Sequence, residues 1–169
     1  MFRAARGRDT VVDAMPTSFL VRQVGPAALA AVTALTACTQ PLGPARTFED
    51  YELKAADTAD AILSAVRTAE LAADVAARGR AFPPYVSVVL QDAESDADGA
   101  VSTFEKVQPP DARSDRLRTQ LGDLTSEATD ALSTLRITAR RADLDALGPR
   151  SRDLEDLADR LDAFASEHG

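Results

Sequence analysis

The segment LRTQLGDLTSEATDALSTLRIT, residues 117–138, carries the most regular apolar pattern in the chain. Spacings of four and three residues alternate without a break through Leu117, Leu121, Leu124, Ala128, Ala131, Leu135 and Thr138. Such spacing is typical of the seam along which packed helices meet. It predicts a helix from about Asp111 to Arg140–Arg141, where the two positive charges suit the negative end of the helix dipole.

Two more helices are predicted upstream of this segment. One lies between Pro83-Pro84, which suit a first helical turn, and Pro109-Pro110, which end it. Its apolar stripe contains Val86, Val89, Ala93, Ala97, Ala100, Phe104 and Val107, flanked by Leu90 and Val101. The other runs from about Phe48 to Arg78, with Thr47 as its cap and Gly79 as its stop. Its stripe contains Tyr51, Ala55, Ala59, Ile62, Val66, Ala69, Ala73 and Ala76.

A fourth helix is predicted near the C-terminus, and its start has two alternatives. It begins either with Asp143 as its cap, with a kink at Gly148-Pro149, or later, at Pro149 itself. Its inward positions are Leu144, Leu147, Leu154, Leu157, Leu161 and Phe164.

Short connectors join the four predicted helices, which forces neighbouring helices to be antiparallel. No stretch alternates at a period of two for long enough to form a sheet. The sequence therefore predicts an all-α, up-down-up-down four-helix bundle over residues 48–169. The alanine-rich seams of the first two helices predict a close approach between them, with leucine filling the other half of the core.

Residues 1–37 have the pattern of a secretory signal peptide. A basic leader precedes an uncharged, mostly apolar run from Gly25 to Leu35. The arginines of the leader are Arg3, Arg6, Arg8 and Arg22, and a true start at Met15 would give a more compact signal. The apolar run is shorter than the roughly 20 residues that a membrane-spanning helix needs, and it contains Pro26. It therefore does not predict a span by itself.

The residues Leu35-Thr36-Ala37-Cys38 resemble the lipobox of bacterial lipoproteins: aliphatic, small, small, cysteine. The resemblance implies transfer of a diacylglyceryl group to the Cys38 sulfur and signal cleavage between Ala37 and Cys38. Two or more acyl chains hold a protein on a bilayer far better than one chain does. Residues 38–47 would then form a short lipidated tether. The alternative is that Cys38, the only cysteine, is a small buried residue of a helix.

Charge narrows the class of partner. Of the 19 basic and 27 acidic residues, four and two lie in residues 1–37, which leaves a net charge of −10 for residues 38–169. That charge disfavours nucleic acid as a partner. The whole chain resembles the uncharacterised small helical lipoproteins of high-GC Gram-positive bacteria, through the lipobox, Pro84–Leu90 and Val107–Asp111. The resemblance implies location and fold, and it brings no activity with it.

The segment Glu94–Glu105 follows the spacing of an EF-hand calcium loop. Acidic residues stand at loop positions 1, 3 and 5, glycine at position 6 and glutamate at position 12. The apolar stripe nevertheless continues through the segment in phase, which favours a solvated acidic face of one uninterrupted helix. A calcium loop is the alternative.

Other residues that could carry chemistry are few. His168 is expected to be solvated, rather than a zinc ligand or a base. Arg136 and Arg140–Arg141 form a modest basic end, either solvated or in contact with an anionic lipid or polymer. Tyr51 and Tyr85 are expected to pack in the core, with stacking on a ligand as the alternative. Without a Gly-x-Ser-x-Gly turn or a histidine placed as a base, no catalytic residue, metal or cofactor is expected.

These observations predict a non-enzymatic lipoprotein on the outer face of the cytoplasmic membrane, anchored in the lipid bilayer through acylated Cys38. Its expected role is interaction with another cell-envelope protein or with itself. The alternatives are a solute- or calcium-binding bundle and a cell-wall hydrolase with paired carboxylates. A contiguous exposed apolar patch would mark the partner face, and a uniformly polar surface would count against this role. The sequence leaves the partner, the ligand and the oligomeric state open.

Overall fold

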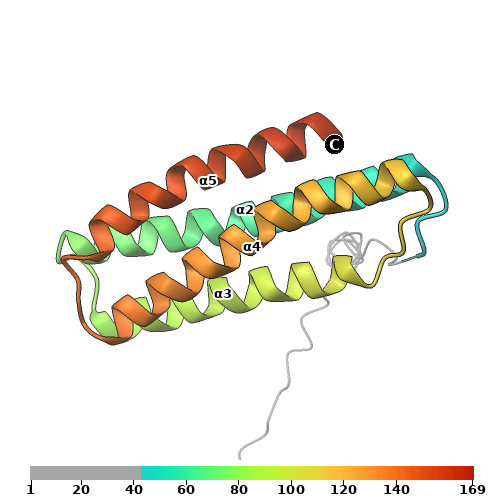
Figure 1. The fold of residues 1–169 in the computed structure, drawn as a ribbon. Coiled ribbons are helices and arrows are strands. Elements are labelled where there is room, and N and C mark those ends of the chain that lie inside the picture. The colour runs from blue at the N-terminus through green and yellow to red at the C-terminus, as the bar shows by residue number, and fades with distance from the viewer. Residues whose placement is uncertain (1–42) are drawn as a thin grey trace, which may run out of the picture. The chain divides into compact units, whose positions relative to one another are not determined.

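The computed structural model describes residues 43–169. These residues form four helices and no strand: α2 (Phe48–Ala77), α3 (Pro83–Glu105), α4 (Ala112–Arg140) and α5 (Leu147–His168) (Figure 1). Successive helices run in opposite directions, so the predicted four-helix bundle is confirmed for this part of the chain. The predicted signal peptide, the alternative start at Met15, the cleavage site after Ala37 and the lipid attachment site Cys38 lie outside the described residues.

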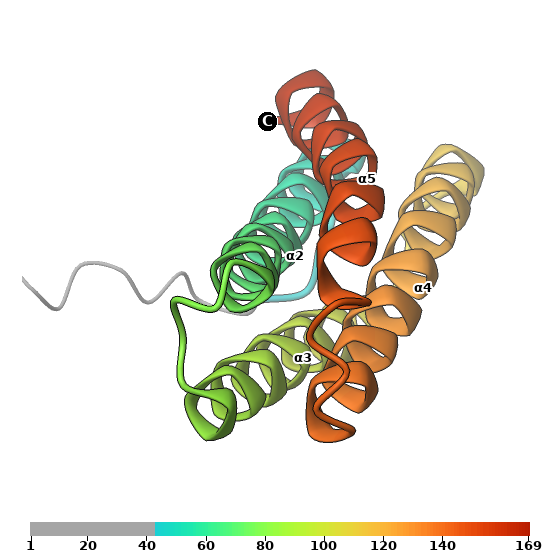
Figure 2. The ribbon, with the colours of Figure 1, turned by 90° about the vertical axis from the view of Figure 1, so that its left-hand side faces the viewer.

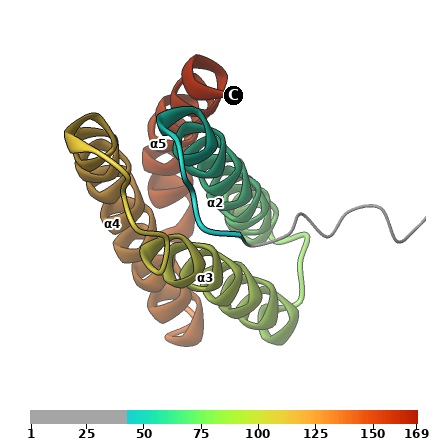
Figure 3. The same ribbon diagram turned by 90° about the vertical axis from the view of Figure 1, so that its right-hand side faces the viewer.

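The four helices are not equivalent in the cross-section of the bundle (Figures 2 and 3). α2 and α4 contact each other across the centre, whereas α3 and α5 do not approach each other closely within the described part of the chain. The alanine seam of α2 predicts a close contact with α3, but α2 packs more extensively against α5. Small residues allow this contact, because a Cβ added at Gly148 would lie only 3.4 Å from the Cβ of Ala77.

The core is built from the predicted stripe of α2 and from leucines of α4 and α5. Every predicted position of the α2 stripe is buried. Tyr51 is fully buried, with its ring centroid 5.2 Å from that of Phe104 on α3, so it packs in the core as predicted. On α3 the buried residues are Val86, Leu90, Ala93, Ala97 and Phe104, whereas Val89, which the sequence places in the stripe, is only half-buried.

The buried face of α4 follows the predicted seam at Leu117, Leu121, Ala128, Leu135 and Thr138, and departs from it at two positions. Leu124 and Ala131 are only half-buried, and the neighbouring Thr125 and Leu132 are buried in their place. A strict alternation of four and three fits a supercoiled helix, whereas a straight helix drifts by about 20° per heptad from that repeat. In the middle of α4 the core face therefore takes in the next residue at two places, while Ala128, Leu135 and Thr138 stay buried as predicted. Thr125 is tolerated there because its hydroxyl donates to the carbonyl oxygen of Gly122 at 3.0 Å.

Side chains cap the N-termini of α2 and α4. The Thr47 hydroxyl accepts a hydrogen bond from the backbone N–H of Asp50 at 3.1 Å, as the sequence predicts. The Asp111 carboxylate accepts from both the backbone N–H and the hydroxyl of Ser114, each at 2.8 Å. The backbone hydrogen bond of Ser114, followed by that of its hydroxyl, holds the pKa of Asp111 below its ordinary value.

The Asp111 cap is expected to make stability depend on pH. Because the pKa of Asp111 is lowered on folding, its contribution is present above the unfolded value of about 3.9 and is lost as the pH falls through the folded value. Asp111→Asn keeps an oxygen acceptor that does not titrate. We expect this variant to be less stable than the wild type near neutral pH and to lose that deficit below about pH 4. Urea unfolding of the wild type and the variant at pH 7 and below about pH 4 measures the difference in stability. The same difference at both pH values would show that the Asp111 carboxylate is not its cause.

The C-termini of α2 and α4 close with the same hydrogen-bonded motif. The residue after the C-cap adopts a left-handed conformation: Gly79 after α2, with φ of +67°, and Ala142 after α4, with φ of +56°. In each case two backbone N–H groups donate to carbonyl oxygens of the last turn. After α2, Gly79 donates to Ala76 and Arg80 to Val75; after α4, Ala142 donates to Ala139 and Asp143 to Thr138. Glycine adopts this conformation freely, whereas alanine is strained in it.

Exchanging these two residue types should therefore have opposite effects. We expect Ala142→Gly to raise the free energy of unfolding by about 0.5–1 kcal/mol. The matched change Gly79→Ala should lower it by about 1 kcal/mol. No atom lies within 4 Å of a Cβ built at Gly79, so backbone strain alone causes the loss. Chemical unfolding of the two variants measures both effects, and equal signs would show that the left-handed residues are not responsible.

The start of α5 falls between the two predicted positions. The helix begins at Leu147, so Pro149 lies in its first turn, where a missing N–H costs nothing. Asp143 does not cap the helix; its carboxylate accepts from the N–H of Ala146 at 3.3 Å and closes the preceding turn. The predicted inward residues Leu147, Leu154, Leu157, Leu161 and Phe164 are buried, and Leu144 is half-buried in the connector.

Candidate binding groove between α2 and α3

Two adjoining cavities form a groove along the surface where α2 meets α3. The first has a volume of about 250 Å³ and an almost entirely apolar lining, made by Thr68, Leu71, Ala72, Val75, Ala81, Tyr85, Val86 and Val89. The second has a volume of about 310 Å³ and is lined by Ala61, Ser64, Ala65, Thr68, Tyr85, Val89, Asp92, Ala93 and Asp96. Thr68, Tyr85 and Val89 belong to both cavities, so the groove is continuous from the apolar end to the acidic end.

Two large apolar residues of the groove lining, Leu71 and Tyr85, are exposed, and so are Phe82 and Val88, three residues to either side of Tyr85. Leu71 is 63% exposed, Phe82 73%, Tyr85 65% and Val88 55%. We call these four residues the apolar rim. They come from the second half of α2, the connector and the first turns of α3, whose junction is visible at one end of the bundle (Figure 2). Four exposed large apolar residues gathered on one pair of helices form the kind of patch that marks an interaction surface.

The local sequence of α3 explains why Tyr85 faces outward. Pro83 and Pro84 fill the first two helical positions, and the carbonyl of Phe82 accepts from the N–H groups of Tyr85 and Val86. Val86 is buried in the core. Successive residues of a helix are turned by about 100°, so Tyr85 cannot share that direction. Its ring lines the groove, and the prediction that Tyr85 packs in the core like Tyr51 is wrong.

The inner end of the groove is acidic. Asp92 and Asp96 lie one turn apart on α3 and line the second cavity. Neither carboxylate forms an ion pair with any residue of the described part of the chain. The opposite wall is neutral, and its Thr68 hydroxyl donates to the Ser64 carbonyl at 2.8 Å within α2. This end of the groove therefore presents negative charge without a cation beside it.

Ion pairs join three other pairs of contacting helices: α2 with α5, α4 with α5, and α3 with α4. Arg67 of α2 binds Asp159 of α5 at 2.7 Å, and Arg160 of α5 binds Glu127 of α4 at 2.7 Å. Arg136 of α4 makes a two-pronged contact with Glu94 of α3, with its Nη2 3.2 Å from Oε1. Across residues 43–169, no ion pair links α2 to α3. The groove thus follows a surface seam that no ion pair closes within the described part of the chain.

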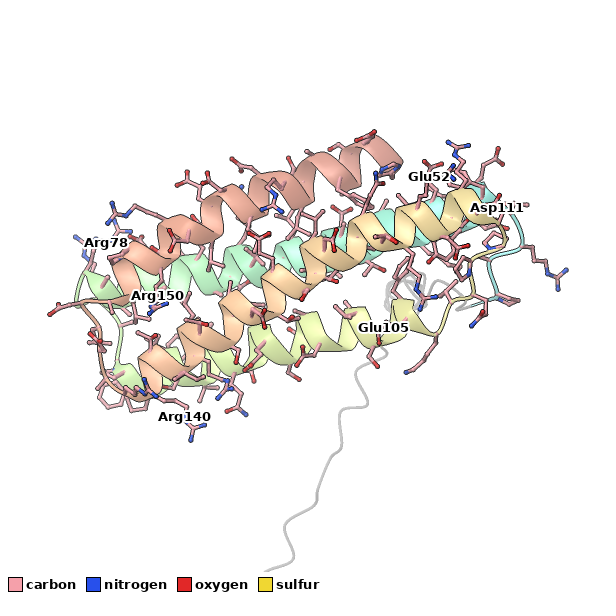
Figure 4. The ribbon with its side chains drawn as sticks, viewed as in Figure 1. Glu52, Arg78, Glu105, Asp111, Arg140 and Arg150 are labelled. Atoms are coloured by element: carbon pink, nitrogen blue, oxygen red, sulfur yellow. The ribbon has the colours of Figure 1, made fainter. Side chains whose placement is uncertain are left out.

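Two predicted surface residues are engaged in contacts that the sequence does not reveal. Arg136, predicted as part of a free basic end, is instead held by Glu94, and that hydrogen bond raises the pKa of the guanidinium. His168, predicted to be solvated, is largely buried; its Nδ1 lies 2.9 Å from Glu52 and its ring 4.6 Å from that of Phe164. Arg140 remains exposed at the end of the bundle shared with Arg78 and Arg150 (Figure 4).

The segment Glu94–Glu105 does not form a calcium loop. It is helical through Glu105, as the continuous apolar stripe favours, so its carboxylates spread along α3 instead of converging. Glu94, the first position of the proposed loop, is occupied by the contact with Arg136. Within residues 43–169, no three histidine, cysteine or acidic side chains are grouped so that they could hold a metal ion.

None of the four described helices combines the length and apolar character needed to cross a membrane. Comparison of the chain with protein-family models, with curated proteins and with solved structures gave no match.

Proposed function

We propose that this protein is a lipid-anchored, non-enzymatic interaction module of the bacterial cell envelope, held at the outer face of the cytoplasmic membrane by acylated Cys38. The observation that carries the interaction role is the apolar rim beside the α2–α3 groove. A patch of this kind is the feature expected of a partner face, and a uniformly polar surface would have argued against the role.

The proposed location is supported by the sequence before the bundle. The lipobox Leu35-Thr36-Ala37-Cys38 follows an apolar run and a basic leader, in the order of a lipoprotein signal. Acyl chains on Cys38 would bind the bilayer with about 0.8 kcal/mol per buried methylene. α2 starts at Phe48, so few residues separate the proposed anchor from the bundle. Part of this connection already packs on the core, because Ala45 is buried.

The anchor is tested by Cys38→Ala in cells fed a fatty-acid probe. We expect the wild-type protein to take up the probe and to sediment with membranes. The Cys38→Ala variant should lose the label entirely, because the sulfur is the proposed attachment atom. Equal labelling of both proteins would overturn the anchoring part of the proposal.

The interaction role is tested by photo-cross-linking in intact cells. A photoreactive phenylalanine analogue at Tyr85 is expected to give discrete adducts with an envelope protein, because this position is exposed within the apolar rim. The same analogue at Leu53 is the matched control, since Leu53 is 53% exposed on α2 outside both cavities. No discrete adduct at Tyr85, or the same adducts at both positions, would argue against an interaction module that uses this face.

A further inference from the structure

We infer that the α2–α3 groove binds an amphipathic helix of a partner protein, with the apolar face of that helix on the apolar rim and its basic side chains beside Asp92 and Asp96. The inference rests on the proposed function, which makes this face the partner surface. It adds the chemical class of the partner.

The dimensions of the groove fit a helix. Its lining on α2 runs from Ala61 to Val75, which at 1.5 Å per residue is about 21 Å. A helix of about 14 residues covers that length and presents an apolar stripe at positions spaced by three and four. Laid between α2 and α3, it would pack against both, as a third helix packs into the groove between two others.

Exposure of the rim distinguishes a helix from a small enclosed ligand. Phe82, Tyr85 and Leu71 are each more than three-fifths exposed, so they do not close over the groove. A small molecule inside the cavities would leave much of their apolar surface in water. A helix lying along the groove would cover them, and removal of this apolar area from water would drive binding.

The negative charge of the groove indicates that the polar face of the partner helix is basic. Asp92 and Asp96 line the inner cavity without an ion-pair partner among residues 43–169, and lysine or arginine on the bound helix would supply one. Residues 38–169 carry a net charge of −10, which attracts a basic partner over longer distances as well. The same charge disfavours a second copy of this chain and the anionic surface of a membrane as occupants.

The test uses two synthetic helical peptides of about 18 residues with leucine at helical spacing on one face. One peptide carries lysines at one end of its polar face and the other carries glutamates there. Binding of each fluorescent peptide to the purified full chain is followed by anisotropy. We expect the lysine peptide to bind at least about tenfold more tightly than the glutamate peptide at low salt, and the preference to shrink as salt is added.

Substitutions locate the binding to the groove. Leu71→Asp should weaken binding of the lysine peptide at least about tenfold, whereas Leu53→Asp should leave it unchanged, because both side chains are exposed and only Leu71 lines the groove. The double change Asp92→Lys and Asp96→Lys should remove most of the preference for the lysine peptide, because the two carboxylates that would pair with its lysines are replaced by positive charges. All these side chains face solvent, so the far-ultraviolet circular dichroism of each variant should match that of the wild type.

Four results would overturn the inference. These are no binding of the lysine peptide at millimolar concentration, equal affinity for both peptides, equal loss in the Leu71 and Leu53 variants, and an undiminished lysine preference in the double variant. Two further assays test other occupants. If the chain forms concentration-dependent dimers that Leu71→Asp abolishes, the groove binds a second copy instead. If the chain binds anionic phospholipid vesicles and Leu71→Asp abolishes that binding, the groove binds lipid instead. If cross-linking at Tyr85 succeeds while the peptide tests fail, the proposed function stands and only this inference falls.

Discussion

Truncation of Leu132 to alanine is expected to lower the free energy of unfolding by about 2–5 kcal/mol. Leu132 lies on α4 and is fully buried. Removing its branched end takes apolar area out of the core and leaves a cavity that the surrounding helices can only partly close. Urea unfolding followed by circular dichroism at 222 nm measures the loss through the shift of the midpoint.

The matched control is Leu124→Ala on the same helix. Leu124 belongs to the seam predicted from the sequence, but it is only half-buried, so we expect a loss well below that of Leu132→Ala. Both substitutions remove the same atoms and keep a good helix former. If Leu124→Ala were the more damaging of the two, the core face of α4 would follow the predicted seam and not the one described above.

Enlargement of Ala73 to leucine is the second substitution with a large expected effect. Ala73 lies in the α2 stripe and is fully buried in the core cluster. Three additional carbon atoms have no space there, so α2 and its neighbours must move apart or the new side chain must leave its preferred rotamers. We expect a loss of about 1–3 kcal/mol in the free energy of unfolding, measured by urea unfolding.

Ala61→Leu provides the comparison for this change. Ala61 is exposed on the same helix, and leucine is nearly as good a helix former as alanine, so stability should stay within about 0.5 kcal/mol of the wild type. Similar losses at Ala73 and Ala61 would mean that the effect arises from helix propensity and not from packing. An unchanged Ala73→Leu variant would show that the alanine seam does not set the distance between the helices.

The helices and most of their ends could be predicted from the sequence because the signals are local. Thr47 caps α2, and the proline pair starts α3. Gly79 terminates α2 by adopting a left-handed conformation just after the C-cap. Each of these signals acts within four residues, and neither distant contacts nor the packing angle of the bundle alters it. The stripe of α2 was predictable for a similar reason, since all its apolar residues keep one phase.

The errors concern what distant parts of the chain do to each other. Whether Thr125 or Leu124 is buried in the core depends on how straight α4 is. The curvature of α4 depends in turn on its packing against the other helices. The contacts of Arg136 with Glu94 and of His168 with Glu52 join residues 42 and 116 positions apart. Periodicity along one helix contains no information about such pairs.

The sequence predicts that an apolar patch should exist, but not where on the bundle it lies. The sequence indicates that an interaction module should expose an apolar patch, but it assigns Tyr85 to the core with Tyr51. Val86 and Val89 both fit the apolar stripe of α3 and both line the first cavity, and only the packing of α3 against α2 shows that Val86 is buried and Val89 half-buried. The uncovered seam becomes visible once α2 is seen to pack more extensively against α5.

The length of α2 has a mechanical consequence. Its 30 residues extend for about 45 Å, and the apolar rim lies near the end opposite to Phe48, where the chain enters the bundle. The bundle is a stiff arm, with Leu71 of the rim about 35 Å along α2 from Phe48. The tilt of the bundle at its entry therefore sets the height at which the rim lies above that point.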